Sequence, residues 1–159
     1  MSASAMTKPA HFVSNVIAAA AFPYHVVFPL LRLDVKLEQA GLFALGLILS
    51  ASLPDHIEFG VIPHRKVTHC ILIPALMLLA CHYVVQWQWK CLLAGSAVGY
   101  LAHLLCDLMD HGGVHLYPFS PSLGLRIYKT SGMFMWFGVI IWAIACGGLF
   151  VWLELPYWR

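Results

Sequence analysis

The sequence predicts an all-α fold, a polytopic bundle of four to five membrane-spanning helices. Of its 159 residues, 61% are hydrophobic and 10% are charged, whereas soluble domains average about 45–50% and about 25%. The mean hydropathy is +0.80, and the apolar residues form long segments separated by short polar connectors. A helix needs about 20 apolar residues to cross a bilayer. We therefore expect a single integral membrane domain over residues 1–159.

The first two hydrophobic segments differ in how clearly they predict a span. Phe12 to Leu31 is long enough to cross a bilayer, but Pro23 and Pro29 predict a kinked or re-entrant helix. The count of four or five spans depends on this segment. The second segment, Ala40 to Leu53, ends at Pro54. This ending places the acidic residues that follow it at a membrane edge.

The third and fourth segments are predicted over His69–Gln86 and Cys91–Leu108, with Thr68 as the N-cap of the third. Between them, the connector Gln86–Lys90 carries two tryptophans, which is typical of an aromatic belt at the interface. The fourth segment contains small residues that let helices approach closely in lipid, namely Gly95, Ser96, Ala97, Gly99 and Ala102. It is therefore expected to be a central helix.

The C-terminal part contains a long connector and one more span. Residues 110–132 are rich in glycine and proline, which predicts a non-helical segment. If the spans alternate in direction, this segment lies on the same side of the membrane as residues 55–68. The last segment, Met133 to Leu155, is apolar and holds no candidate ligand.

Charge and cysteine content exclude two classes of function. The net charge is only +2 and the basic residues are scattered, so we expect no nucleic acid partner. The five cysteines lie in apolar stretches without a CxxC pair. This pattern is typical of small buried side chains, and it disfavours both a disulfide framework and a thiolate zinc site.

Ionisable residues gather at the ends of the predicted spans, in residues 53–69 and 103–110. A charged side chain at the bilayer centre costs roughly 2.5 kcal/mol or more, so such a cluster indicates a functional site. Helical residues three, four and seven apart share a face, which places His103, Asp107 and Asp110 on one stripe. His64 and His69 complete the set if the loop before the third segment folds back over this stripe.

Imidazole and carboxylate groups together predict a divalent metal at one membrane face, with zinc or manganese as the first choice. A bound divalent ion activates water, so the expected reaction is hydrolysis at the bilayer surface, with a membrane lipid as the partner. Two alternatives fit the same residues. One is a haem-binding bundle that uses His69 or His82 opposite His103, and the other is a non-enzymatic protein with a structural metal.

Three motifs, in this order, resemble the YdjM-like family of membrane-bound metal-dependent hydrolases: LPDHIE at 53–58, HRKVTH at 64–69 and HLLCDLMDHGGVHLYPFS at 103–120. The resemblance covers about residues 41–122. It implies a location in the bacterial inner (cytoplasmic) membrane. It also implies a fold similar to the helical zinc phospholipase C group, which points to lipid phosphoesters as substrates.

The same resemblance implies roles for individual residues. The expected metal ligands are Asp55, His64, His69, His103 and Asp107, with Arg65 and Thr68 as supporting residues. By position, Glu58 and Asp110 are spare carboxylates one helical step from these ligands, so either is a candidate general base. Arg65 is the candidate for contact with an anionic lipid headgroup.

Overall fold

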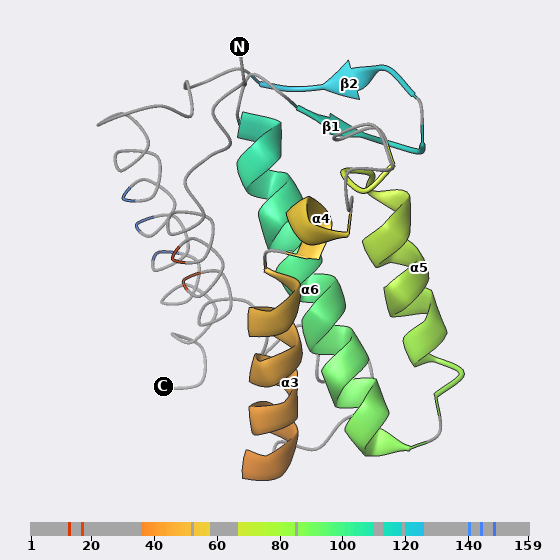
Figure 1. Ribbon diagram of the computed structural model, residues 1–159. Helices are drawn as coiled ribbons and strands as arrows, with labels where there is room; N and C mark the ends of the chain where they lie inside the picture. The colour runs from red at the N-terminus through yellow and green to blue at the C-terminus, as the bar shows by residue number, and fades with distance from the viewer. Residues whose placement is uncertain are drawn as a thin grey trace.

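Figure 1 presents the computed structural model of the chain. The structure describes residues 36–51, 53–57, 67–84, 86–109, 113–118 and 120–125, with isolated positions at 13, 17, 140, 144 and 148. The elements are α3 (Leu37–Ser50), α4 (Leu53–His56), α5 (Leu72–Cys81), α6 (Trp87–Met109), β1 (Val114–His115) and β2 (Ser122–Leu123).

The predicted helical membrane bundle is confirmed in its coarse form. The described residues are mostly helical, and two stretches, Leu37–Asp55 and Trp87–Leu108, are long and apolar enough to cross a membrane. The first and last predicted segments, Phe12–Leu31 and Met133–Leu155, lie outside the described residues apart from isolated positions.

Helix α6 is the central described helix, with α3 on one side and α5 on the other (Figure 1). It begins at Trp87, so the prediction of a connector over Gln86–Lys90 is wrong for most of its length. No proline or glycine occurs between Gln86 and Ala94, and the helix therefore continues through both tryptophans. The prediction of a helix over Cys91–Leu108 is confirmed, because α6 ends at Met109.

Helices α3 and α6 run parallel and touch through glycines. A Cβ atom added at Gly95 would overlap the carbonyl of Phe43, and one added at Gly99 would overlap the carbonyl of Leu47. Each contact advances by four residues along both helices, which is one turn. Gly46 on α3 repeats the pattern from the other side, because its added Cβ would overlap the carbonyl of Leu92. The small residues predicted to bring helices together do so here.

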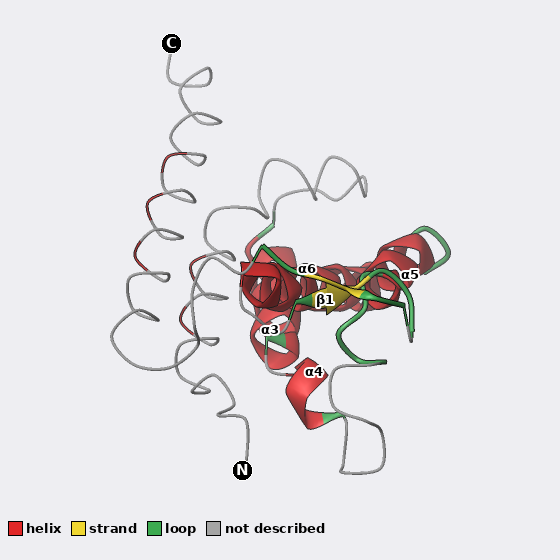
Figure 2. Cartoon of the chain, turned by 90° about the horizontal axis from the view of Figure 1, so that it is seen from above, coloured by secondary structure: helices red, strands yellow, loops and turns green. Residues whose placement is uncertain are grey.

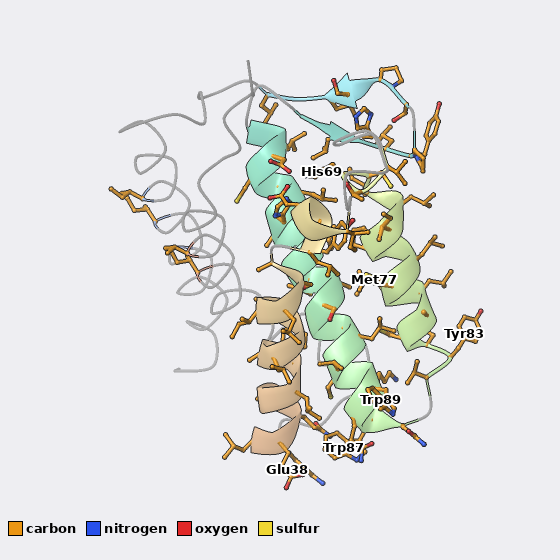
Figure 3. The ribbon with its side chains drawn as sticks, in the orientation of Figure 1. Glu38, His69, Met77, Tyr83, Trp87 and Trp89 are labelled. Carbon is orange, nitrogen blue, oxygen red and sulfur yellow. The ribbon has the colours of Figure 1, made fainter. Side chains whose placement is uncertain are left out.

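Helix α5 packs on another face of α6 through larger side chains. Tyr100 and Leu104 of α6 form a buried cluster with Val114 of β1, against which Ile73 and Met77 of α5 pack. Figure 3 shows Met77 between the two helices. This side of α6 is therefore held by interdigitating side chains, without the glycine contacts seen on the α3 side.

The prediction of a third span over His69–Gln86 is wrong at both ends, because α5 contains only Leu72–Cys81. Ten helical residues rise about 15 Å, half of a hydrocarbon core about 30 Å thick. The helix starts late because the preceding residues pair with β1: Cys70 and His115 form a parallel bridge. Thr68 is therefore not its N-cap, a position that Ile71 occupies without a side-chain hydrogen bond.

The described part of the 110–132 segment is non-helical as predicted, but it contains a hairpin that the all-α prediction missed. Strands β1 and β2 are antiparallel, with Val114 opposite Leu123 and His115 opposite Ser122. Gly113 precedes β1 with a φ of 64°, and an added Cβ would overlap the carbonyl of Leu123. Only glycine fits this position without strain.

The two ends of the described bundle carry different residues. Figure 3 places Glu38, Tyr83, Trp87 and Trp89 at one end and His69 at the other. The hairpin crosses the His69 end, over α5 and α6 (Figures 1 and 2), and α4 lies beside it. The described parts of the two predicted loops, residues 55–57 with 67–69 and residues 113–125, thus lie at the same end of the bundle.

Candidate metal centre

Four of the predicted site residues come together from three parts of the chain. Asp55 lies on α4, just beyond the end of α3, and His69 lies in the turn before α5. His103 and Asp107 lie one turn apart on α6. The helical stripe predicted for His103 and Asp107 is present, because both side chains point to the same centre.

The ligand atoms of these residues are close enough to share one ion. Nε2 of His69 lies 3.2 Å from Oδ1 of Asp55 and 3.2 Å from Oδ2 of Asp107. Nε2 of His103 lies 3.2 Å from the same Asp107 oxygen, 3.7 Å from the Asp55 oxygen and 3.4 Å from Nε2 of His69. For Asp55, His69 and His103, all three ligand atoms lie within 4.8 Å of one another.

These separations match the first shell of a small divalent cation. Zinc binds imidazole nitrogen and carboxylate oxygen at about 2.0–2.2 Å in tetrahedral geometry, so neighbouring ligand atoms lie roughly 3.3–3.6 Å apart. The two imidazole nitrogens, at 3.4 Å, lie within this range, and the nitrogen–oxygen distances of 3.2–3.7 Å lie within about 0.1 Å of it. The donor set of nitrogen and oxygen atoms also suits zinc or manganese.

A backbone hydrogen bond orients His103 for metal binding. Its Nδ1–H donates to the carbonyl oxygen of Ala51, at the end of α3, over 2.8 Å. A carbonyl only accepts, so Nδ1 carries the proton, and in the neutral ring Nε2 keeps its lone pair for the site. Histidines that bind metals usually donate their other N–H in this way.

His69 is held by hydrogen bonds to itself and to the residue before it. Oγ1 of Thr68 lies 3.0 Å from its Nδ1, and the Tyr100 hydroxyl of α6 donates to the Thr68 carbonyl. The backbone N–H of His115 in β1 donates to the His69 carbonyl over 2.8 Å. This ligand therefore sits in a short non-helical segment that both α6 and the hairpin fix in place.

The two carboxylates control the proton affinity of His69. Burial by itself lowers the pKa of this imidazole, but hydrogen bonds and charge interactions with Asp107 and Asp55 outweigh it and raise the pKa to about 9. The site thus attracts positive charge strongly. A proton on His69 supplies that charge, and a divalent cation bound there would have to displace it from the same ring.

The site is closed on most sides. The side chains of His69, His103 and Asp107 have no exposed surface, whereas 26% of the Asp55 side chain is exposed. Among these four residues, Asp55 is the one that water or a substrate can reach. Approach to the centre is therefore from the α4 side.

The remaining predicted site residues are not placed. Glu58, His64, Arg65 and Asp110 lie outside the described residues, so their roles stay predictions. The sequence interpretation missed the parts played by Tyr100, Ala51 and His115. Tyr100 precedes His103 by three residues and so shares its face of α6, which was an available signal. No local pattern marks Ala51 or His115, because both act through their backbone.

The haem alternative loses support from this geometry. A haem between His69 and His103 needs space for a porphyrin between the two rings, but their Nε2 atoms are 3.4 Å apart and a carboxylate oxygen touches both. His82 follows α5 at the end away from His69, about 15 Å of helix rise along the bundle. It does not belong to this cluster.

Comparison with known families agrees with the motifs. The profile of the YdjM inner membrane protein family matches residues 6–157. The chain belongs to this family. Together with the two apolar helices, the match identifies an integral inner-membrane protein. A comparison with the curated proteins and with the solved structures finds no significant match.

Within this YdjM family member, the centre combines four properties that metal chemistry requires. It has converging nitrogen and oxygen donors, an oriented histidine, a net attraction for cations and one partly open side at Asp55. Buried ionisable groups at the end of membrane helices are costly. Coordination of a cation by these side chains would compensate for that cost.

Proposed function

We propose that this protein is a metal-dependent hydrolase that cleaves a lipid or another phosphoester at the surface of the inner membrane. The observation that carries the proposal is that the Nε2 atoms of two imidazoles each lie 3.2–3.7 Å from oxygens of two carboxylates at one end of the bundle. Asp55, His69 and His103 would hold the ion, and Asp107 is the fourth donor within reach. A zinc or manganese ion there supplies an activated water and polarises a carbonyl or phosphoryl oxygen.

The other roles in the proposed reaction belong to residues of the chain. The hydrogen bond from His103 to Ala51 keeps that imidazole in position. Asp55, the exposed ligand, lies where the substrate arrives. Glu58 or Asp110 takes the proton from the attacking water, and Arg65 contacts an anionic headgroup. These last assignments rest on sequence position.

The test of the proposal is hydrolysis by the purified protein in detergent, loaded with zinc or with manganese. A panel of phospholipids and lipid esters is the substrate, and the chelated protein is the control. General-base catalysis contributes about 10²–10⁴-fold, so replacement of the true base, by Glu58→Gln or Asp110→Asn, lowers turnover by that factor and leaves bound metal unchanged. If the metal-loaded protein cleaves nothing on a broad panel, the enzyme proposal fails.

One observation favours a second candidate, a structural metal. Oδ2 of Asp107 is 3.2 Å from both imidazole nitrogens, so the chain offers four donors, and zinc sites with four protein ligands are usually structural. In that case the ion joins α4, α6 and the turn before α5. Removal of the metal would then lower the unfolding temperature, and no lipid would be cleaved under any metal load.

The topology completes the proposal. We infer four to five spans, with residues 55–68 and 110–132 on one side of the membrane. Single cysteines at Gly60 and Ser122 should therefore react with an impermeant reagent from the same side of sealed vesicles. Reaction from opposite sides would contradict this arrangement.

A further inference from the structure

The β1–β2 hairpin has an unusual surface for a connector at the end of a membrane bundle. Residues 113–125 contain no Asp, Glu, Lys or Arg. Four of its large apolar or aromatic side chains are about half exposed: Leu116 (51%), Tyr117 (58%), Leu123 (47%) and Leu125 (62%). Exposed apolar side chains gathered in one short element indicate an interaction with a membrane or another partner.

Several polar backbone groups of the hairpin are hydrogen-bonded within the hairpin itself. The buried hydroxyl of Ser120 accepts hydrogen bonds from the backbone N–H groups of Leu116 (3.1 Å) and Tyr117 (3.4 Å). The Ser120 N–H donates to the Tyr117 carbonyl over 3.1 Å, and Nδ1 of His115 bonds to the Ser120 carbonyl. In lipid, backbone groups must find partners within the protein, and this loop meets much of that requirement by itself.

The length of α6 places the hairpin at the level of the membrane interface. The 23 residues of this helix rise about 35 Å, slightly more than a hydrocarbon core of about 30 Å. Trp87 and Trp89 lie at its first turn (Figure 3), where an aromatic belt marks one interface. The other end of α6, from which the hairpin starts, then reaches the opposite interface.

The orientation of the hairpin is set by its core residue. Side chains alternate between the two faces of a strand, so Val114 and its cross-strand neighbour Leu123 share one face, and His115 and Ser122 share the other. Val114 is buried on Tyr100 and Leu104 of α6. The face of Leu123 is therefore turned toward the helices, and Ser122 points away from them.

Helix α5, which follows the segment paired with β1, also exposes apolar side chains. The Cys70–His115 bridge joins β1 to the residues just before this helix, and the exposed leucines of α5 begin immediately afterwards, at Leu72, Leu76 and Leu79. In an inner-membrane protein, such a stripe on a hydrophobic helix faces lipid.

We infer that the 113–125 hairpin is an interfacial element that inserts its apolar side chains into the boundary between lipid headgroups and acyl chains. It thereby holds the candidate metal centre at headgroup depth, because its backbone donates directly to the carbonyl of His69. This inference concerns the placement of the hairpin in the bilayer, so it stands or falls independently of hydrolysis.

The test compares two neighbouring positions of β2 with an environment-sensitive label. Leu123→Cys and, as the matched control, Ser122→Cys are labelled with an NBD maleimide in the full-length protein, in 3:1 phosphatidylethanolamine and phosphatidylglycerol vesicles. The described cysteines of the chain are buried, and unsubstituted protein gives the labelling background. Quenching is measured with aqueous iodide and with a lipid that carries a doxyl group at acyl carbon 5.

The label at Leu123 should be quenched by the doxyl lipid and protected from iodide, and the label at Ser122 should show the reverse preference. Leu116→Cys serves as a second lipid-facing reporter in case Leu123→Cys disturbs the hairpin. Equal iodide quenching at Leu123 and Ser122 would overturn the inference. Protection of Leu123 from both quenchers would also overturn it, since a protein and not lipid would then cover the surface.

Discussion

Helix α6 touches its two neighbours in different ways, and the difference explains how the candidate metal centre is held. On the α3 side, glycines bring backbone against backbone at Gly95 and Gly99. On the α5 side, the contact consists of large side chains around Tyr100 and Leu104. The first contact fixes the distance between two helix axes through backbone atoms, whereas the second depends on close packing of side chains.

The two candidate histidine ligands, His103 and His69, are also held in different ways. On the α3 side, His103 is bonded to the last turn of α3 through Ala51, so helix position alone sets its geometry. On the α5 side, His69 precedes its helix and depends on hydrogen bonds from Tyr100 and His115 to the backbone around it. A change in the packing of α3 on α6 should therefore displace His103. Loss of a single hydrogen bond near residue 68 or 69 should displace His69.

The largest expected effect is loss of bound metal when a candidate ligand on α6 is removed. His103→Ala or Asp107→Ala removes a donor that lies 3.2 Å from its neighbours, and the purified protein should lose its tightly bound divalent metal. Elemental analysis of the detergent-purified protein measures this. The control is His82→Ala, which removes a histidine at the far end of α5 and should leave metal content unchanged. Stoichiometric metal in a His103→Ala, Asp107→Ala double variant would refute the site.

The next largest effect is expected when the glycine contact between α3 and α6 is disrupted. In Gly95→Ala the new methyl group overlaps the Phe43 carbonyl, so α3 and α6 must separate, and overpacking typically costs about 1–3 kcal/mol. Thermal unfolding in detergent should occur at a lower temperature, and bound metal should fall because Ala51 and Asp55 move away from His103.

The matched control for that variant is Gly41→Ala, also in a helix of the bundle. Nothing lies within 4 Å of the added Cβ at Gly41, and an alanine in a helix is about 0.5–1 kcal/mol more favourable than a glycine. This control should be as stable as the unsubstituted protein or slightly more stable. Equal unfolding temperatures for the two variants would contradict the close contact between α3 and α6.

A smaller effect is expected on the α5 side. Tyr100→Phe keeps the ring that packs on Leu104 but removes the hydroxyl that donates to the Thr68 carbonyl. Loss of an outer-shell partner typically weakens metal binding by about 10–100-fold. Competition with a chelator measures the affinity. Tyr83→Phe, at an exposed tyrosine beyond the far end of α5, is the control and should have no effect on metal affinity.

The smallest expected change, taken per pH unit, is in the pH dependence of metal affinity. The pKa of His69 is raised from 6.5 to about 9 in the metal-free fold, so below pH 9 this imidazole carries a proton that a metal must displace. Metal affinity should therefore rise with pH between about 6.5 and 9, by up to about tenfold per pH unit. Chelator competition at a series of pH values measures the slope. An affinity that does not change over this range would show that no proton leaves on binding.

The sequence predicted the α6 part of the centre because helix geometry is local. His103 and Asp107 are four residues apart, and any α-helix there brings them to one face. The close α3 contact was also predictable in part, since the small residues of the fourth segment indicated a central helix. The partner of each glycine was not predictable, because the relative positions of α3 and α6 are set by contacts between distant residues.

The errors at α5 have a related cause. Hydropathy continues without a break through residues 69–86 and cannot reveal that the residues around Cys70 pair with β1. Strands of two residues are too short to produce an alternating pattern. The contact of Tyr100 with Thr68 joins residues that are distant in sequence, and an aromatic residue in an apolar helix is more often simple packing.

The parallel arrangement of α3 and α6 also has a consequence for biosynthesis. Asp55 precedes Asp107 by 52 residues, and ribosomes add about 5–20 residues per second, so the two ends of the centre are made roughly 3–10 s apart. Helix α3 is therefore made before α6, the helix against which its Gly46 packs. A cation that binds all of these residues could therefore do so only late in assembly, and it would then join the early part of the polypeptide to the late part.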